Sequence, residues 1–197
     1  IDPAARDIGS VNTLVRRDGK LYAWNTDISG FLFMARRAGV ELKDRKVLIL
    51  GSGGTSLTAQ AAARTCGAAK IVVISRGGAD NYDNLDRHSD AQIVVNTTPV
   101  GMYPNVGAAA VDLSRFPACR GVLDVVYNPR RTALLLQAES LGIPCSDGLP
   151  MLVNQAIAAE EHFFRRSIDP AENERVLGLL RREMENIVLI GMPGCGK

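Results

Sequence analysis

The run KVLILGSGGTS, Lys46–Ser56, constrains the fold of this chain more than any other segment. It has the pattern of a short apolar strand entering a glycine turn, and a segment that can be helical, Leu57–Arg64, follows it. Glycines at 51, 53 and 54 let the backbone turn tightly and come close to a ligand. The amides that open the next helix then form an anion site, which the helix dipole favours. A dinucleotide diphosphate fits this geometry, while a plain strand-to-helix connection is the alternative interpretation.

Short β-branched runs alternate with helix-compatible segments after Lys46. Apolar runs of this kind are typical of parallel strands buried on both faces. The alternation therefore predicts an α/β fold with a doubly wound parallel sheet and right-handed crossovers. Residues 77–90 are too short and polar for a full helix and strand, so one crossover is expected to be abbreviated. Strands are expected at 47–50, 71–74, 92–96, 121–126 and, more weakly, 143–146, with helices at 55–66 and 131–141.

The flanking regions have other patterns. Asp2-Pro3 predicts a turn, and the following VNTLVRRDGKLYAW predicts a β-hairpin around Asp18-Gly19. Thr26 or Asp27 is expected to cap a helix that runs to about residue 37. Beyond the sheet, helices are expected at 151–166 and from 169 through 182.

Composition narrows the class of protein. Of the 197 residues, 46% are hydrophobic and 22% are charged, which is typical of a soluble globular core. A net charge of +2 indicates neither a nucleic-acid surface nor a membrane patch, and no segment resembles a transmembrane span or a signal peptide. The four cysteines are scattered without a CxxC pair, so we expect reduced thiols, a cytoplasmic location and no metal site.

The end of the second strand indicates which nicotinamide cofactor is used. An acidic residue about twenty positions beyond the glycines binds the ribose hydroxyl of NAD, whereas arginine there accommodates the 2′-phosphate of NADP. Here the strand ends in Ser75 and Arg76, and the first carboxylate is Asp80. Serine can donate to phosphate, and arginine binds it with a planar fork of donors. This pattern favours NADP over NAD, although a solvated arginine at a strand end is also common.

Six ordered blocks resemble the shikimate dehydrogenase family, whose members reversibly reduce 3-dehydroshikimate to shikimate with NADPH. The resemblance extends from Ile8 to about Phe164 and implies a Rossmann-like cofactor domain beside a second α/β substrate domain. The blocks are IGSVNT at 8–13, NTD at 25–27, GSGGTS at 51–56, NTTPVGM at 96–102, DVVYNP at 124–129 and GLPMLVNQA at 148–156.

The resemblance implies roles for individual residues. Asp27 would belong to a catalytic Lys–Asp pair, in which the lysine handles the proton that reduction of a ketone needs beside the carbonyl. Its carboxylate would hold that lysine and would also bind a substrate hydroxyl. The further substrate contacts it implies are Asn12, Tyr127 and Gln155. The cofactor-binding positions it implies are Gly51, Ser52, Gly53, Gly54, Thr55, Ser75 and Arg76 for the phosphates, with Val125, Gly148 and Met151 at the nicotinamide end.

Each of these residues also has a structural interpretation. Asp27 could be only a helix N-cap, and Asn12 could close a turn. Tyr127 and Gln155 could satisfy backbone groups where helices meet the sheet, and Met151 could be core filler.

The sequence also departs from the family pattern. The family's catalytic lysine belongs to an upstream segment that ends Pro-x-Lys, and none of the lysines here, at 20, 43, 46, 70 and 197, lies in such a motif. We therefore expect a chain truncated at its amino terminus that binds NADP(H) but turns over shikimate poorly or not at all. A non-catalytic NADP-binding module and a dehydrogenase for quinate or a related hydroxy acid remain alternatives.

The last residues, NIVLIGMPGCGK at 186–197, carry a β-run and a G-x-x-x-x-G-K pattern. This is a P-loop without its terminal Ser or Thr, although a chance match in a glycine-bearing tail gives the same letters. Shikimate kinases open similarly, so we expect a dehydrogenase–kinase fusion. The expected organisation is a substrate-domain remnant at 1–24, a connecting helix at 25–45, the NADP-binding domain at 46–147, a returning helix at 148–166, a helical linker at 167–185 and a truncated kinase start at 186–197.

Overall fold

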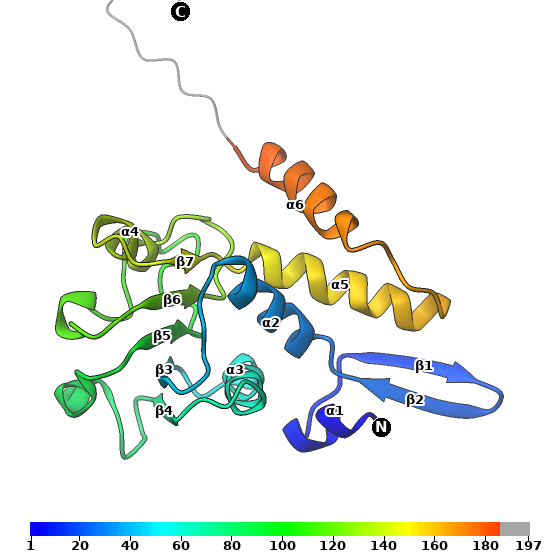
Figure 1. The fold of residues 1–197 in the computed structure, drawn as a ribbon, viewed down its shortest axis with the longest axis horizontal. Coiled ribbons are helices and arrows are strands. Elements are labelled where there is room, and N and C mark those ends of the chain that lie inside the picture. Colours follow the sequence, from blue (N-terminus) through cyan, green and yellow to red (C-terminus); the bar gives the residue numbers. More distant parts are fainter. Residues whose placement is uncertain (186–197) are drawn as a thin grey trace, which may run out of the picture.

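Five parallel strands form the central sheet of the computed structural model, which describes residues 1–185. The strands are β3 (Lys46–Leu50), β4 (Lys70–Ile74), β5 (Ile93–Asn96), β6 (Gly121–Asp124) and β7 (Cys145–Ser146). Their order across the sheet is β4-β3-β5-β6-β7 (Figure 1). The chain leaves β3 toward one side to form β4 and crosses to the other side to form β5, so the sheet is doubly wound as predicted. A crevice at the carboxyl ends of β3 and β5 follows from this topology.

Helices cover both faces of the sheet because alternate strand residues point to opposite sides. In β3, Val47 and Ile49 pack with α2 (Asp27–Arg37) and α3 (Gly54–Thr65), whereas Leu48 and Leu50 pack on the other face. That other face is covered by α4 (Ala133–Ser140) and by the 3₁₀ helices η1 (Tyr82–His88) and η2 (Leu113–Arg115).

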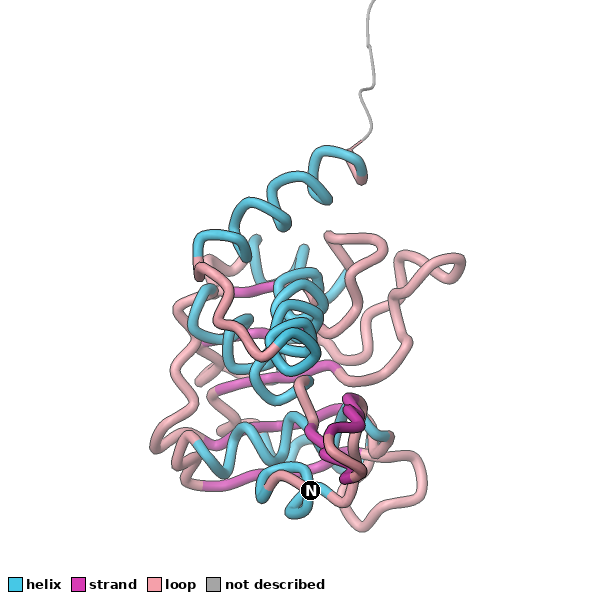
Figure 2. The backbone as a smooth tube through the Cα atoms, turned by 90° about the vertical axis from the view of Figure 1, so that its right-hand side faces the viewer, coloured by secondary structure: helices cyan, strands magenta, loops and turns pink. Residues whose placement is uncertain are grey.

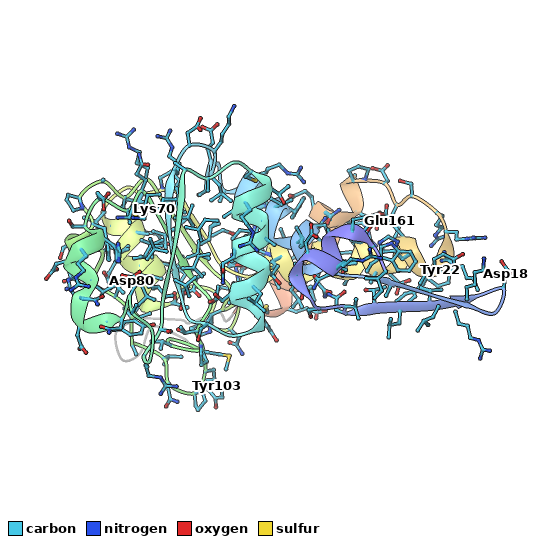
Figure 3. The ribbon with its side chains drawn as sticks, turned by 90° about the horizontal axis from the view of Figure 1, so that it is seen from below. Asp18, Tyr22, Lys70, Asp80, Tyr103 and Glu161 are labelled. Atoms are coloured by element: carbon cyan, nitrogen blue, oxygen red, sulfur yellow. The ribbon has the colours of Figure 1, made fainter. Side chains whose placement is uncertain are left out.

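A β-hairpin and two long helices extend the molecule beyond the sheet. The hairpin consists of β1 (Thr13–Arg17) and β2 (Lys20–Trp24), follows α1 (Pro3–Ile8), and has Asp18 at its tip, at the end of the molecule remote from Asp80 (Figure 3). Helix α5 (Leu149–Phe164) runs from the sheet to the hairpin, and α6 (Ala171–Glu183) lies along its outer side (Figures 1 and 2). Gly30 of α2 makes close packing on α5 possible, since a Cβ there would lie 2.5 Å from the carbonyl oxygen of Met151.

Most predicted elements are confirmed. The hairpin turns at Asp18 and Gly19, whose φ angles of 48° and 73° suit a tight primed turn. The abbreviated crossover is η1, and the remaining predicted strands and helices lie within about two residues of their expected bounds, apart from two corrections.

One expectation was wrong, and one predicted strand is shorter than expected. Residues 2–3 begin helix α1 instead of forming a turn, because the Asp2 side chain accepts a hydrogen bond from the Ala4 amide and Pro3 suits the first helical position. The strand expected at 121–126 ends at Asp124, whose carboxylate accepts a hydrogen bond from the Val126 amide. Within residues 1–185 no helix is both long and apolar enough to cross a membrane.

Candidate functional site

The glycine turn after β3 exposes the amino terminus of α3. Gly51 has a φ of +105°, and a Cβ there would lie 2.9 Å from the Thr97 hydroxyl oxygen. Gly53 is the N-cap of α3 without a side-chain cap bond, and a Cβ at Gly53 or Gly54 would meet no atom within 4 Å. The first amides of a helix have no intrahelical acceptor. The turn therefore presents free N–H groups to open space, which is what a phosphate needs.

A cavity of ≈ 520 Å³ lies beside this turn, in the crevice that the sheet topology predicts. We call it the turn cavity. It brings together residues from the ends of β3, β4 and β5 and from η1: Gly51, Ser52, Gly53, Ser75, Arg76, Tyr82, Thr97, Thr98, Pro99 and Val100.

Arg76 gives the turn cavity its positive charge, as the other lining residues are uncharged. Asp80, the first carboxylate after β4, bonds His88 through its Oδ1 atom, 2.8 Å from Nε2. That carboxylate does not line the cavity, so it is not positioned as a ribose-binding acid. The positive charge of Arg76 therefore suits a ribose that carries a 2′-phosphate better than a ribose with a free 2′-hydroxyl.

A second cavity, of ≈ 340 Å³, lies between the sheet and the segment around the hairpin. We call it the junction cavity. Its lining is drawn from positions far apart in the chain: Asn12, Asp27, Thr55, Val125, Tyr127, Gly148, Met151, Leu152 and Gln155.

Asp27 lies at the start of α2, where Asn12 holds its side chain. The Asn12 Nδ2 atom donates to Asp27 Oδ1 at 2.9 Å, and the Asn12 Oδ1 atom accepts from the Thr26 amide at 3.0 Å. Thr26 is the N-cap of α2, so the interpretation of Asp27 as an N-cap is wrong. Partial burial raises the pKa of Asp27 above its ordinary value, while the bond from Asn12 opposes this shift. A partly desolvated carboxylate in a cavity is suited to holding a cation or a substrate hydroxyl.

Backbone packing at the carboxyl end of β6 shapes the rest of the junction cavity. At Gly148 a Cβ would lie 2.0 Å from the Val125 carbonyl oxygen, so α5 begins in direct contact with this strand end. The Tyr127 side chain, 44% exposed, borders the opening. Gln155 donates from Nε2 to the carbonyl oxygen of Leu152 at 3.1 Å, one turn earlier in α5.

The two cavities flank the same helix terminus. Gly53 lines the turn cavity, and Thr55, two residues later, lines the junction cavity. An extended ligand with its phosphates at the start of α3 would therefore reach from one cavity into the other.

The predicted site residues fall into these two groups, with one exception. Gly54 lines neither cavity. Sequence reasoning did not name six lining residues, although the NTTP run at the end of a parallel strand could have indicated Thr97. They are Tyr82, Thr97, Thr98, Pro99, Val100 and Leu152. Neither lining contains a lysine, and the G-x-x-x-x-G-K run lies outside the described residues.

A larger cavity of ≈ 650 Å³ lies between α2, α5 and the start of α6. None of the predicted site residues lines it. In it, Arg37 pairs with Glu174 at 2.8 Å, so neither of these two charges is free for a ligand. Its size therefore does not make it the candidate site. Among the described residues, no group of three or more His, Cys, Asp or Glu could hold a metal ion.

Comparisons with known proteins identify the relatives of this chain. No family model matches the chain. Shikimate dehydrogenase (NADP(+)) of Clostridium perfringens strain SM101 is 34% identical over 189 residues, which cover 89% of this chain and 70% of that relative.

Solved structures show the same fold. A chorismate mutase/shikimate 5-dehydrogenase fusion protein from Clostridium acetobutylicum matches with a TM-score of 0.88 and 31% identity, covering 93% of this chain and 71% of that one. Shikimate 5-dehydrogenase from Thermus thermophilus, in complex with NADP(H) and shikimate, gives 0.78 and 29%, over 93% and 72%. Quinate dehydrogenase from Corynebacterium glutamicum, in complex with NAD, gives 0.79 and 29%, over 89% and 70%.

Proposed function

The chain belongs to the shikimate dehydrogenase family, and from this premise we propose that the turn cavity binds NADP and that the junction cavity binds the substrate ring. The family is one of oxidoreductases, and NADP is the cofactor named for the Clostridium perfringens and Thermus thermophilus relatives. The observation that carries the proposal is the gathering of Asn12, Asp27 and Gln155 in one cavity beside the exposed amino terminus of α3.

The turn cavity fits NADP on its own chemistry. The open space at Gly53 and Gly54 admits a diphosphate to the first amides of α3. At the end of β4, Ser75 offers a hydroxyl and Arg76 a guanidinium for the 2′-phosphate. Bound NADPH would supply the hydride that reduces the substrate carbonyl.

The junction cavity fits a polyhydroxylated ring. Asn12, Tyr127 and Gln155 offer amide and phenol groups that both donate and accept hydrogen bonds. Asp27 accepts hydrogen bonds, and in our proposal its carboxylate orients a substrate hydroxyl together with the cation that handles the carbonyl proton. Val125, Gly148 and Met151 give the side toward α5 an apolar surface against which a nicotinamide ring can pack.

The residues that line this cavity include no lysine, so none of them is the cation that would handle the carbonyl proton. We propose that residues 1–197 bind NADP but turn over shikimate poorly unless a lysine-bearing segment completes the cavity. The test is to mix the purified chain with the separately produced amino-terminal segment of a relative and to follow NADPH formation with shikimate. Restored activity supports the proposal, whereas robust oxidation by the 197 residues alone would refute the requirement for that segment.

Cofactor choice has its own test, because a ligand that binds the folded state raises its apparent stability. NADP should raise the melting temperature of the chain more than an equal concentration of NAD. A larger shift with NAD would overturn the roles proposed for Ser75 and Arg76.

Two other functions give different results in the same experiments. A dehydrogenase for quinate, favoured by the structural likeness to the Corynebacterium glutamicum enzyme, would oxidise quinate faster than shikimate in the reconstituted mixture. A non-catalytic NADP-binding module would bind NADP but would stay inactive with every segment and substrate.

We also propose that the protein is a cytoplasmic dehydrogenase–kinase fusion. In this proposal the GMPGCGK run belongs to the phosphate-binding loop of the kinase. The sequence of the parent gene tests this idea. A codon other than Ser or Thr directly after Lys197 would exclude the kinase loop.

A further inference from the structure

Tyr82 is the aromatic residue of the turn cavity, and neither the sequence motifs nor the family resemblance assigned it a role. It is the first residue of η1, and its half-buried side chain lines the cavity together with Ser75 and Arg76. Burial raises the pKa of the Tyr82 phenol, while the nearby Arg76 guanidinium opposes this shift. The phenol therefore keeps its proton at neutral pH and remains a hydrogen-bond donor.

The cavity needs such a donor if it receives a phosphate. A phosphate monoester carries about −1.5 to −2 charges at pH 7 and offers three strong acceptor oxygens. Arg76 is the one charged side chain in the lining, so it cannot satisfy all of these oxygens. Hydroxyl groups beside it, such as those of Ser75 and Tyr82, can supply further hydrogen bonds.

The segment that carries Tyr82 is fixed by its own hydrogen bonds. Asn81 accepts from the Asp83 amide at 2.9 Å, and Asn84 accepts from the Asn81 amide at 2.9 Å, which forms a capping box around Tyr82. Upstream, the Ser75 amide donates to the Asp80 carbonyl oxygen at 3.2 Å, which closes the loop between β4 and η1. The backbone that carries Tyr82 is thus held in place before any ligand binds, which lowers the entropic cost of binding.

The same arrangement holds the Asp80 carboxylate away from the proposed phosphate site. Its carboxylate bonds the ring of His88, which is 6% exposed, at the far end of η1. A free carboxylate beside Arg76 would repel a phosphate and attract a ribose diol instead. The Asp80–His88 pair therefore anchors η1 and keeps that negative charge bonded outside the cavity.

From this geometry we propose that Tyr82 determines cofactor specificity by donating its phenol hydrogen to the 2′-phosphate of NADP, alongside Arg76. The inference rests on the proposed function, since it assumes that the turn cavity holds the adenosine end of NADP. It differs from adenine stacking, which would use the ring of Tyr82 and not its hydroxyl.

The test compares two probes, adenosine 2′,5′-bisphosphate and 5′-AMP, which differ only in the 2′-phosphate that the first carries. Isothermal titration gives their dissociation constants for the full chain, for Tyr82→Phe and for Tyr22→Phe, a tyrosine on the hairpin that is 40% exposed. Tyr82→Phe should weaken binding of the bisphosphate about tenfold, equivalent to about 1.4 kcal/mol, and should leave the dissociation constant of 5′-AMP within about twofold. Tyr22→Phe should change neither constant.

The outcomes separate this inference from the proposed function. If the unmodified chain prefers the bisphosphate and Tyr82→Phe leaves that preference intact, the role of Tyr82 is refuted while the NADP site stands. An equal loss of both probes in Tyr82→Phe also refutes it, because the hydroxyl would then act on a shared part of the ligands. If the unmodified chain binds 5′-AMP as tightly as the bisphosphate, the NADP site fails and the inference fails with it.

Discussion

Asn96 and Asp124, the last residues of the adjacent strands β5 and β6, are joined by a hydrogen bond of 2.9 Å between the Asn96 Nδ2 and Asp124 Oδ1 atoms. Both side chains are completely buried. Asn96 also accepts a hydrogen bond from the Thr98 amide, and Asp124 accepts one from the Val126 amide. Thr98 lines the turn cavity and Val125 lines the junction cavity, so this one pair fixes the loops that border both.

Asp124 should make stability depend on pH in an unusual direction. Burial raises its pKa from 3.8 to about 6, although hydrogen bonds from Thr132, Val126 and Asn96 oppose the shift. The folded state therefore binds this proton more tightly than the unfolded chain does. The resulting contribution to the free energy of unfolding is complete below pH 3.8 and is lost as the pH rises through about 6.

Asp124→Asn removes this titration. Urea unfolding of both proteins should show that the stability of the unmodified chain relative to the variant increases by about 1–3 kcal/mol between pH 7 and about pH 4. Taking the difference between the two proteins cancels the titration of groups that do not interact with Asp124. Asp18→Asn, at the exposed hairpin tip, is the control. A difference that stays constant or shrinks on acidification would contradict the assignment.

Gly148→Ala should destabilise the fold by more than about 2 kcal/mol, because overpacking at a site without free space forces the backbone to shift. The added Cβ would lie 2.0 Å from the Val125 carbonyl oxygen. Gly178 in α6 is the matched control, since a Cβ there would meet no atom within 4 Å. Gly178→Ala should raise stability by about 0.5–1 kcal/mol. Urea midpoints measure both changes, and equal effects would refute the close contact.

The docking of the hairpin on α5 can be followed through Trp24, the single tryptophan of the chain. Its ring stacks on that of His162, with centroids 4.2 Å apart and planes inclined by 14°. His162→Ala uncovers one face of the indole, so the emission maximum should shift to longer wavelength and stability should fall by about 0.5–1.5 kcal/mol. His88→Gln, which changes the other histidine, should leave the emission maximum unchanged. Identical spectra for His162→Ala and the unmodified chain would argue against the stack.

The sheet was predictable because its strands are continuous β-branched runs buried on both faces, which few other structures accommodate. The predicted bounds differed from the structure where local polar side chains begin or end an element. Asp2 caps α1, and Asp124 ends β6 by accepting from the Val126 amide, and neither effect is visible in the hydrophobic pattern.

The candidate site was predictable only in part. Asn12, Asp27 and Gln155 came from the family resemblance, since no periodicity links residues so far apart in the chain. Tyr82 was missed because it lies in a short polar crossover without a motif, and only the packing of η1 against the end of β4 brings it beside Arg76.

Asp27→Asn tests the proposed chemistry of the junction cavity. In the mixture with a lysine-bearing amino-terminal segment, the variant should lose at least about 100-fold in turnover, because an amide cannot hold the ammonium group and accept the substrate hydroxyl as a carboxylate does. Its thermal shift with NADP should stay close to that of the unmodified chain, since the proposed phosphate contacts lie in the turn cavity, which Asp27 does not line. Asp7→Asn, an exposed carboxylate on α1, should change neither quantity.

The pH profile of that mixture gives a second readout of the same carboxylate. Because burial raises the pKa of Asp27 above 3.8, turnover should already decline on acidification at a pH above that value. A merely structural role for Asp27 would lower stability without tying turnover to the ionisation of this group. Full turnover by Asp27→Asn with an unchanged profile would remove Asp27 from the catalytic pair.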